Sequence, residues 1–190
     1  MKKYKIFVLL FFATITIMAA CKKENSPQNE LSKLPAATQS GANTFGCLVN
    51  GKAWVAQTDC KYLCDPAFKI YYDAGSGGNL FITTVYQDSK NSIKQDIVMS
   101  MDSTNTIKLF NIAQRGKAHM GFSFINEMIA GDCYSIHSID SLIVTATGSV
   151  NLSKYDLQNG IISGTFEFYL TKPNCDPISA ANGRFDYKLF

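Results

Sequence analysis

The chain has 190 residues, of which 46% are hydrophobic and 17% charged, so it has enough apolar material for a folded core. Three of its 18 basic residues, Lys2, Lys3 and Lys5, lie before residue 21, and all 15 acidic residues lie after it. A chain that loses this leader carries 15 basic and 15 acidic residues. Such a balance lacks the basic excess typical of nucleic-acid-binding proteins and does not favour that class.

The N-terminus has the pattern of a secretory signal peptide. After the three lysines, residues 6–18 are an uninterrupted apolar run, followed by Ala19 and Ala20. Thirteen helical residues extend about 20 Å, which is less than the roughly 30 Å needed to span a bilayer. Residues 1–20 are therefore predicted to be a cleaved leader rather than a membrane anchor.

The residue after this leader is a cysteine. Met18-Ala19-Ala20-Cys21 is similar to a bacterial lipobox, with methionine at the position where leucine is usual. In that motif the Cys21 thiol receives a diacylglycerol group, and two or three acyl chains hold a protein durably on a membrane. Lys22 follows where an inner-membrane retention signal tends to place aspartate, which favours the outer membrane.

A polar segment separates this cysteine from the rest of the chain. Residues 22–44 include two prolines and show no sustained apolar period, so residues 21–44 are predicted to be the lipidated cysteine and a flexible linker. Residues 45–190 form one predicted domain, because no second linker and no internal repeat follow.

The predicted domain consists almost entirely of strands. Asn50-Gly51 separates two apolar runs and favours a two-residue type I′ hairpin turn. Residues 75–78 are a glycine-rich turn without the lysine and helix of a phosphate-binding loop. Strand patterns recur about every ten residues, and residues 103–116 are the one ambiguous segment. The fold class is all-β, a single antiparallel β-sandwich or barrel-like domain, with strands expected at 44–49, 52–56, 68–72, 79–87, 92–101, 120–125, 141–152, 162–170 and 183–190.

Both ends of the mature chain resemble an uncharacterised family of lipoproteins from Bacteroidota. The resemblance rests on LPAATQSGANTFGCLVNGKAW and on GTFEF with GRFDYKLF near the C-terminus, and it is weakest over residues 56–140. It implies an envelope location and a largely β fold. Because the family has no assigned activity, cofactor or catalytic residues, it transfers no functional site.

The C-terminal motifs hold the best candidate pair of carboxylates. Phe166, Phe168 and Leu170 should face one way, and Thr165, Glu167 and Tyr169 the other. If this strand pairs with residues 183–190, Glu167 could lie opposite Arg184 or Lys188 as a cross-strand ion pair. An alternative hypothesis makes Glu167 and Asp186 the two acids of a glycosidase, which needs carboxyl groups about 5–5.5 Å or about 6.5–9.5 Å apart. A charged, solvated face is the plainer interpretation.

Five cysteines follow Cys21, an odd number for an oxidising compartment. Two bridges at most can form within the chain, each stabilising it by about 2–4 kcal/mol. The preferred bridge joins Cys47 to Cys175, since both lie in the family-like ends. Cys60–Cys64 is a small-loop alternative, and Cys60–Cys133 and Cys64–Cys133 are its rivals.

The remaining constellations for chemistry are weak. Cys60 and Cys64 with Cys133 and His137 would make an incomplete zinc site, and no metal or other cofactor is predicted. If their segment is a strand, Cys133 and His137 are expected to lie about 13 Å apart, too far for a nucleophile and its base. His119 has no acidic neighbour in sequence. Trp54, the single tryptophan, is expected in the core rather than in a sugar-stacking position.

Three functional hypotheses follow from these patterns. The first is a lipid-anchored, β-rich envelope module that binds a glycan, a peptide or another envelope protein. The second is an envelope hydrolase using Glu167 and Asp186, although no catalytic constellation is convincing. The third is a purely structural role in the cell envelope.

Overall fold

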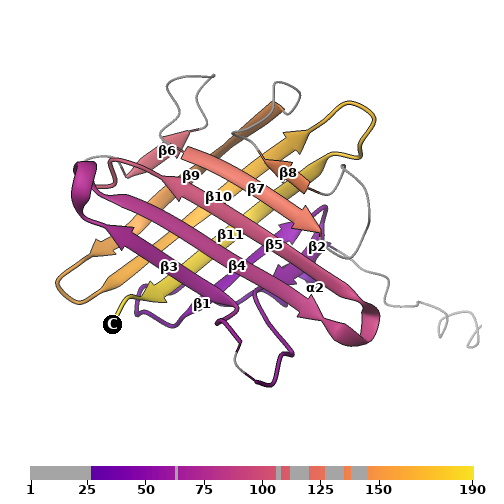
Figure 1. The fold of residues 1–190 in the computed structure, drawn as a ribbon, viewed down its shortest axis with the longest axis horizontal. Helices are drawn as coiled ribbons and strands as arrows, with labels where there is room; N and C mark the ends of the chain where they lie inside the picture. Colours follow the sequence, from indigo (N-terminus) through magenta and orange to yellow (C-terminus); the bar gives the residue numbers. More distant parts are fainter. Residues whose placement is uncertain (1–26, 63, 106–107, 112–119, 127–134, 138–144) are drawn as a thin grey trace, which may run out of the picture.

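The chain folds into eleven described strands, seen here in a computed structural model (Figure 1). The structure describes residues 27–62, 64–105, 108–111, 120–126, 135–137 and 145–190. The predicted signal peptide and Cys21 lie outside these ranges. The elements are α2 (Pro27–Leu31), β1 (Thr44–Val49), β2 (Lys52–Val55), β3 (Phe68–Asp73), η1 (Gly75–Gly77), β4 (Asn79–Asp88), η2 (Ser89–Asn91), β5 (Ile93–Met101), β6 (Leu109–Asn111), β7 (Met120–Asn126), β8 (Ser135–His137), β9 (Thr145–Asp156), β10 (Ile161–Thr171) and β11 (Ile178–Lys188).

The strands form two antiparallel sheets packed face to face, so the all-β prediction is confirmed. The first sheet has the order β2-β1-β11-β10-β9-β6, and the second β3-β4-β5-β7-β8. Figure 1 shows the second sheet in front, with its strands running across those of the first sheet behind it. The strand β11 lies inside the first sheet, between β1 and β10, which joins the two ends of the chain.

The local turn signals correspond closely to the structure. Asn50 and Gly51 both have positive φ, 48° and 80°, and connect β1 to β2 with Val49 opposite Lys52. This is the type I′ geometry that Asn-Gly favours. The glycine-rich segment after β3 is the short 3-10 helix η1, which leads directly into β4. In the ambiguous segment 103–116, the described residues contain the short strand β6.

The core lies between the sheets and is rich in aromatic rings. Phe45, Phe166 and Phe168 come from the first sheet, and the alternation predicted for β10 is confirmed because Phe166, Phe168 and Leu170 are buried. Phe168 packs on Phe122 of the second sheet with ring centroids 4.6 Å apart. Trp54 is 4% exposed and belongs to this core, as predicted.

Residues 27–43, which precede β1, are not a free linker. The Glu30 carboxylate of α2 accepts the N–H of Ala53 at 2.9 Å, so α2 covers the edge strand β2. Leu34 is buried, and Pro35 lies against Gly46. The flexible linker predicted for residues 21–44 is therefore wrong for residues 27–43. The polar composition of this segment gave no indication of its few specific contacts with the domain. We refer to residues 27–43 as the N-terminal strap.

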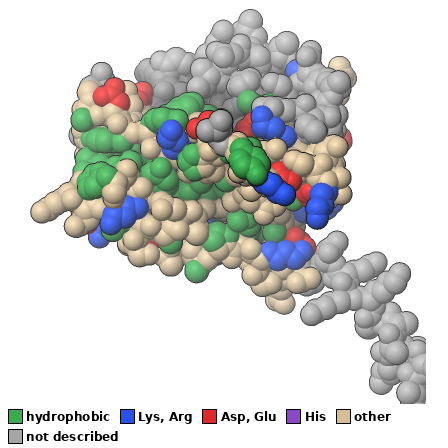
Figure 2. All heavy atoms as spheres, turned by 60° about the horizontal axis from the view of Figure 1, so that its bottom comes forward, with side chains coloured by type: hydrophobic (Ala, Val, Ile, Leu, Met, Phe, Trp, Pro, Cys, Tyr) green, Lys and Arg blue, Asp and Glu red, His purple; other side chains and the backbone are tan. Residues whose placement is uncertain are grey.

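The described surface mixes both charges. On the face shown in Figure 2, lysine and arginine side chains alternate with aspartate and glutamate, and hydrophobic side chains gather mainly toward the left. Among the described residues, no helix combines the length and the apolar character needed to cross a bilayer.

Candidate functional site

Asp186 on β11 is a structural carboxylate. It is 1% exposed, and its two oxygens accept six hydrogen bonds of 2.6–3.4 Å. Burial alone would raise its pKa, but the hydrogen bonds outweigh burial and hold the pKa well below its usual range. The donors are the hydroxyls of Ser163, Thr38 and Ser40 and the backbone N–H groups of Ser40, Gly41 and Ala42.

The structure contradicts the alternative hypothesis in which Glu167 and Asp186 act together as the two acids of a glycosidase. Asp186 lies opposite Ser163 on β10, and Glu167 is four residues further along that strand. Four residues of strand correspond to about 13 Å, beyond the separation that either class of glycosidase uses. The oxygens of Asp186 are also fully engaged by the N-terminal strap and Ser163, so this carboxylate is not available for acid–base catalysis.

The predicted ion pair across β10 and β11 is also wrong. Thr165, not Glu167, lies opposite Arg184, and Ile161 lies opposite Lys188. The cause is the register of the two strands, which the alternation of side chains did not reveal. In addition, β11 carries a β-bulge opposite Glu167. Phe166 pairs with Gly183 and Phe168 with Ala180, so Glu167 alone faces two residues of β11.

Two glycines bring the neighbouring strands unusually close to β10 on either side of Glu167. A Cβ on Gly148 of β9 would lie 2.3 Å from the Glu167 carbonyl oxygen, and a Cβ on Gly183 of β11 would lie 2.6 Å from the Phe166 carbonyl oxygen. Both separations are far below van der Waals contact, so a side chain at either position would force the backbone of the paired strands to shift. Bulges and strand glycines of this kind often mark places where a side chain is re-aimed or a ligand approaches.

The outer face of the first sheet carries two rows of side chains across its strands. In the first row, Ser149 lies opposite both Asn111 and Glu167. In the second, Asn151 lies opposite both Leu109 and Thr165, and Thr165 lies opposite Arg184. Directly opposed side chains on one face lie about 4.5–5.5 Å apart. The two rows thus place amide, hydroxyl, carboxylate and guanidinium groups on one surface.

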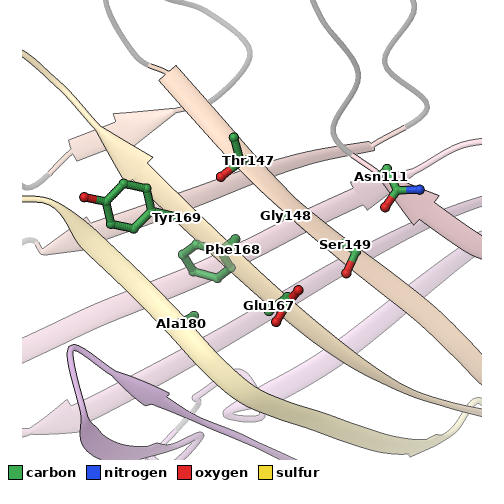
Figure 3. A pocket seen from close by; sticks show the side chains of 8 residues that line it. All are labelled: Asn111, Thr147, Gly148, Ser149, Glu167, Phe168, Tyr169 and Ala180. Carbon is green, nitrogen blue, oxygen red and sulfur yellow. The ribbon is translucent and has the colours of Figure 1, made fainter.

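This surface is hollowed on both sides of Glu167. One hollow has a volume of about 360 Å³ and the other about 350 Å³, and both are lined by Ser149 and Glu167. Tyr169 lines the first hollow and is 46% exposed. Figure 3 shows Thr147, Ser149, Glu167, Tyr169 and Asn111 around the first hollow, on strands β9, β10 and β6. We call this surface, formed by the two hollows and the rows between them, the outer groove.

The chemistry of the outer groove is that of reversible polar binding. Its hydroxyl and amide groups each offer donors and acceptors, and Tyr169 adds an exposed aromatic ring with a polar tip. Glu167 is the central carboxylate, without a second carboxylate beside it among the lining residues. The groove is therefore suited to recognising a neutral, hydroxyl-rich ligand rather than to two-carboxylate hydrolysis.

The disulfide pairing of the cysteines differs from the preferred prediction. Cys47 is a free, buried thiol inside the core, so the predicted Cys47–Cys175 bridge is wrong. Its side chain points between the sheets, as the alternation along β1 requires. The Cys60–Cys64 bridge does form, with Cα atoms 6.1 Å apart. Cys175 is also disulfide-bonded, and Cys133 lies outside the described residues.

The alternative zinc site loses two of its ligands, because Cys60 and Cys64 are bonded to each other. Within the described ranges no cluster of three or more histidine, cysteine, aspartate or glutamate side chains is arranged to hold a metal. The backbone of His137 belongs to β8, whereas His119 and Cys133 lie outside the described residues.

Sequence reasoning identified only part of the outer groove. The alternation along β10 indicated that Thr165, Glu167 and Tyr169 share a face, and all three are exposed. The contributions of Asn111 and Ser149 were missed, because they depend on the pairing of β6 and β10 with β9. Gly148, a glycine inside a long strand pattern, was the local signal that another strand approaches closely there.

A comparison of the chain with models of protein families, with curated proteins and with solved structures found no match. The resemblance to Bacteroidota lipoproteins thus remains a prediction, and the function is argued from the groove itself.

Proposed function

We propose that this protein is a lipid-anchored module of the cell envelope that binds a glycan in the outer groove. The observation that carries the binding proposal is the pair of hollows around Glu167, bordered by amides, hydroxyls and the exposed ring of Tyr169. The anchor is proposed from the leader and from Cys21, with the outer membrane as the favoured location.

A glycan is favoured because of the kind of groups that the groove presents. Each sugar hydroxyl both donates and accepts hydrogen bonds, and side chains such as Asn111, Asn151 and Thr165 can do the same. The apolar face of a sugar ring packs well on an aromatic ring, a role suited to Tyr169. The two hollows lie along neighbouring strands and share lining residues, which suits a chain of several sugar units better than one enclosed molecule.

The binding proposal is tested with a soluble chain covering residues 22–190, which retains the strap and every core residue. Titration calorimetry against neutral oligosaccharides and envelope polysaccharide fragments should find a saturable ligand. Tyr169→Ala should weaken its binding about tenfold, equal to about 1.4 kcal/mol. Glu167→Gln should weaken binding less, because the amide keeps the shape and one acceptor.

Tyr71→Ala is the matched control. Tyr71 is 49% exposed, close to the 46% of Tyr169, but it lies on β3 in the other sheet. An equal loss in both variants would contradict the location of the site. Binding of envelope peptides, with no response to any glycan, would contradict the class of ligand.

The anchor is tested separately by intact-mass analysis of the protein purified from membranes. The proposal expects a chain that begins at Cys21 and carries the added mass of acyl chains. A full-length chain in the cytosol, without added mass, would contradict it.

A further inference from the structure

A separate concavity, of about 360 Å³, opens at one end of the sandwich, between the two sheets. The β1–β2 hairpin and the start of β11 form one wall, and β4, β5 and β7 form the other. None of its lining residues belongs to the outer groove. We call it the end cavity.

The end cavity has an apolar floor. Trp54, Phe124 and Ile178 lie at its base and are 4%, 2% and 6% exposed, while Tyr86 and Ile93 are half-buried beside them. A concave, mostly apolar site with a few polar groups is the usual form of a small-molecule pocket. Hydrocarbon bound here would be removed from water, which favours its binding.

Most polar groups of the rim are already engaged within the protein. The indole N–H of Trp54 donates to the side-chain oxygen of Gln95 at 3.1 Å. The Asn50 side chain accepts the N–H of Ser179 and donates to the carbonyl of Pro177. These bonds fix the hairpin and the start of β11, so the shape of the cavity is formed before any ligand enters.

Among the residues that the structure describes, Lys52 is the one charged residue that lines the end cavity. It is exposed at the start of β2, and the positive charge of its side chain acts on Glu30. That carboxylate is already engaged by the Ala53 N–H and by an ion pair with Lys33. The rim therefore offers a cation, and the described lining residues include no carboxylate that would oppose an incoming anion.

We infer that the end cavity binds an aliphatic monocarboxylate, with the hydrocarbon chain against Trp54, Phe124 and Ile93 and the carboxylate at Lys52. Charge complementarity selects an anion, and the apolar floor selects an alkyl chain over a compact polar acid. The inference does not depend on glycan binding, because the two sites share no residue.

Decanoate is the probe, and the protein supplies its own reporter. Trp54 is the single tryptophan of the chain, so its emission and its indole N–H resonance report directly on the cavity. Decanoate added to the chain of residues 22–190, below its micelle concentration, should change both signals in a saturable manner. Decanol, which has the alkyl chain without the charge, should bind about tenfold more weakly.

Two variants and two controls locate the site. Lys52→Ser should weaken decanoate binding about tenfold and leave decanol unchanged, since only the charge-assisted contact is lost. Ile93→Phe fills the cavity with a residue that strands accept and should abolish both responses. Lys61→Ser and Tyr169→Ala, which remove groups outside the cavity, should bind as the parent chain does.

Three results would overturn the inference. The first is an unchanged Trp54 indole resonance at saturating decanoate. The second is equal affinity for decanol and decanoate, which would remove the role of Lys52. The third is undiminished binding in Ile93→Phe when its thermal melt shows a folded protein.

Discussion

At the scale of single residues, Asp186 is the clearest case of a polar group that the fold depends on. Its hydrogen bonds tie the N-terminal strap to β10 and β11, so residues far apart in sequence meet at one carboxylate. A hydrogen bond to a charged group contributes roughly 1.5–3 kcal/mol, and buried donors left without a partner cost a similar amount. Asp186 therefore anchors the strap and performs no chemistry.

Asp186→Asn should lower the free energy of unfolding by about 2–4 kcal/mol at neutral pH, measured by urea denaturation. The folded-state pKa of Asp186 lies below its unfolded value of about 3.9. Its stabilisation is thus complete above that value and is lost as pH falls toward the folded pKa. The difference between parent and variant should shrink below about pH 4. The exposed Asp176→Asn should change little, and a pH-independent difference would contradict the account.

The free thiol of Cys47 is protected by its position. Burial raises its pKa to about 12, so the reactive thiolate is scarce at ordinary pH. In the native protein at about pH 8, an alkylating reagent should leave the Cys47 peptide unlabelled, as read by peptide mass mapping. The same peptide should label fully after denaturation, and rapid native labelling would contradict the burial of this side chain.

At the scale of elements, the outer groove depends on how closely β9 and β10 approach each other. Gly148→Ala should force these strands apart, because the new Cβ would overlap the Glu167 carbonyl oxygen. Overpacking of this kind costs about 1–3 kcal/mol. Thermal melts should show the loss, and glycan binding should weaken with it.

Gly51→Ala is the control for backbone strain alone. Gly51 also has a positive φ, of 80°, but a Cβ there would meet nothing within 4 Å. Its cost should be about 1 kcal/mol, with glycan binding intact. If the two variants behaved alike in both assays, the close approach at Gly148 would not be what shapes the groove.

The strands show which parts of the fold are readable from sequence. Alternation and turn residues located most of them, because inward and outward positions differ in polarity along β4, β5 and β10. The register between β10 and β11 was not readable, because alternation shows which face a residue takes but not which residue lies opposite it. The ion pair expected at Glu167 failed for that reason. The rows of the outer groove depend in the same way on the residues that pair with β9.

The N-terminal strap shows a different limit. Its polar, proline-containing composition is typical of a linker, yet Glu30, Leu34 and Thr38 each make a specific contact with the domain. These contacts depend on hydrogen-bonding groups and apolar surface of strands that are distant in sequence. The local sequence pattern of the strap therefore does not predict them.

At the scale of the whole molecule, the strap shortens the proposed tether. Only residues 22–26 separate Cys21 from α2, a span of about 18 Å at full extension. Under the proposed lipidation, the folded body is therefore held close to the bilayer, rather than at the reach of a linker extending to Thr44. The groove and the end cavity would both act near the membrane surface.

The most direct measurement of the central claim is an NMR titration of the isotope-labelled chain of residues 22–190 with the tightest-binding oligosaccharide. The account predicts that backbone shifts change at residues 147–151, 165–169 and 182–184, around Glu167, and stay constant on β3 and β4. Shift changes centred on β3 and β4, or on the end cavity around Trp54, would contradict it.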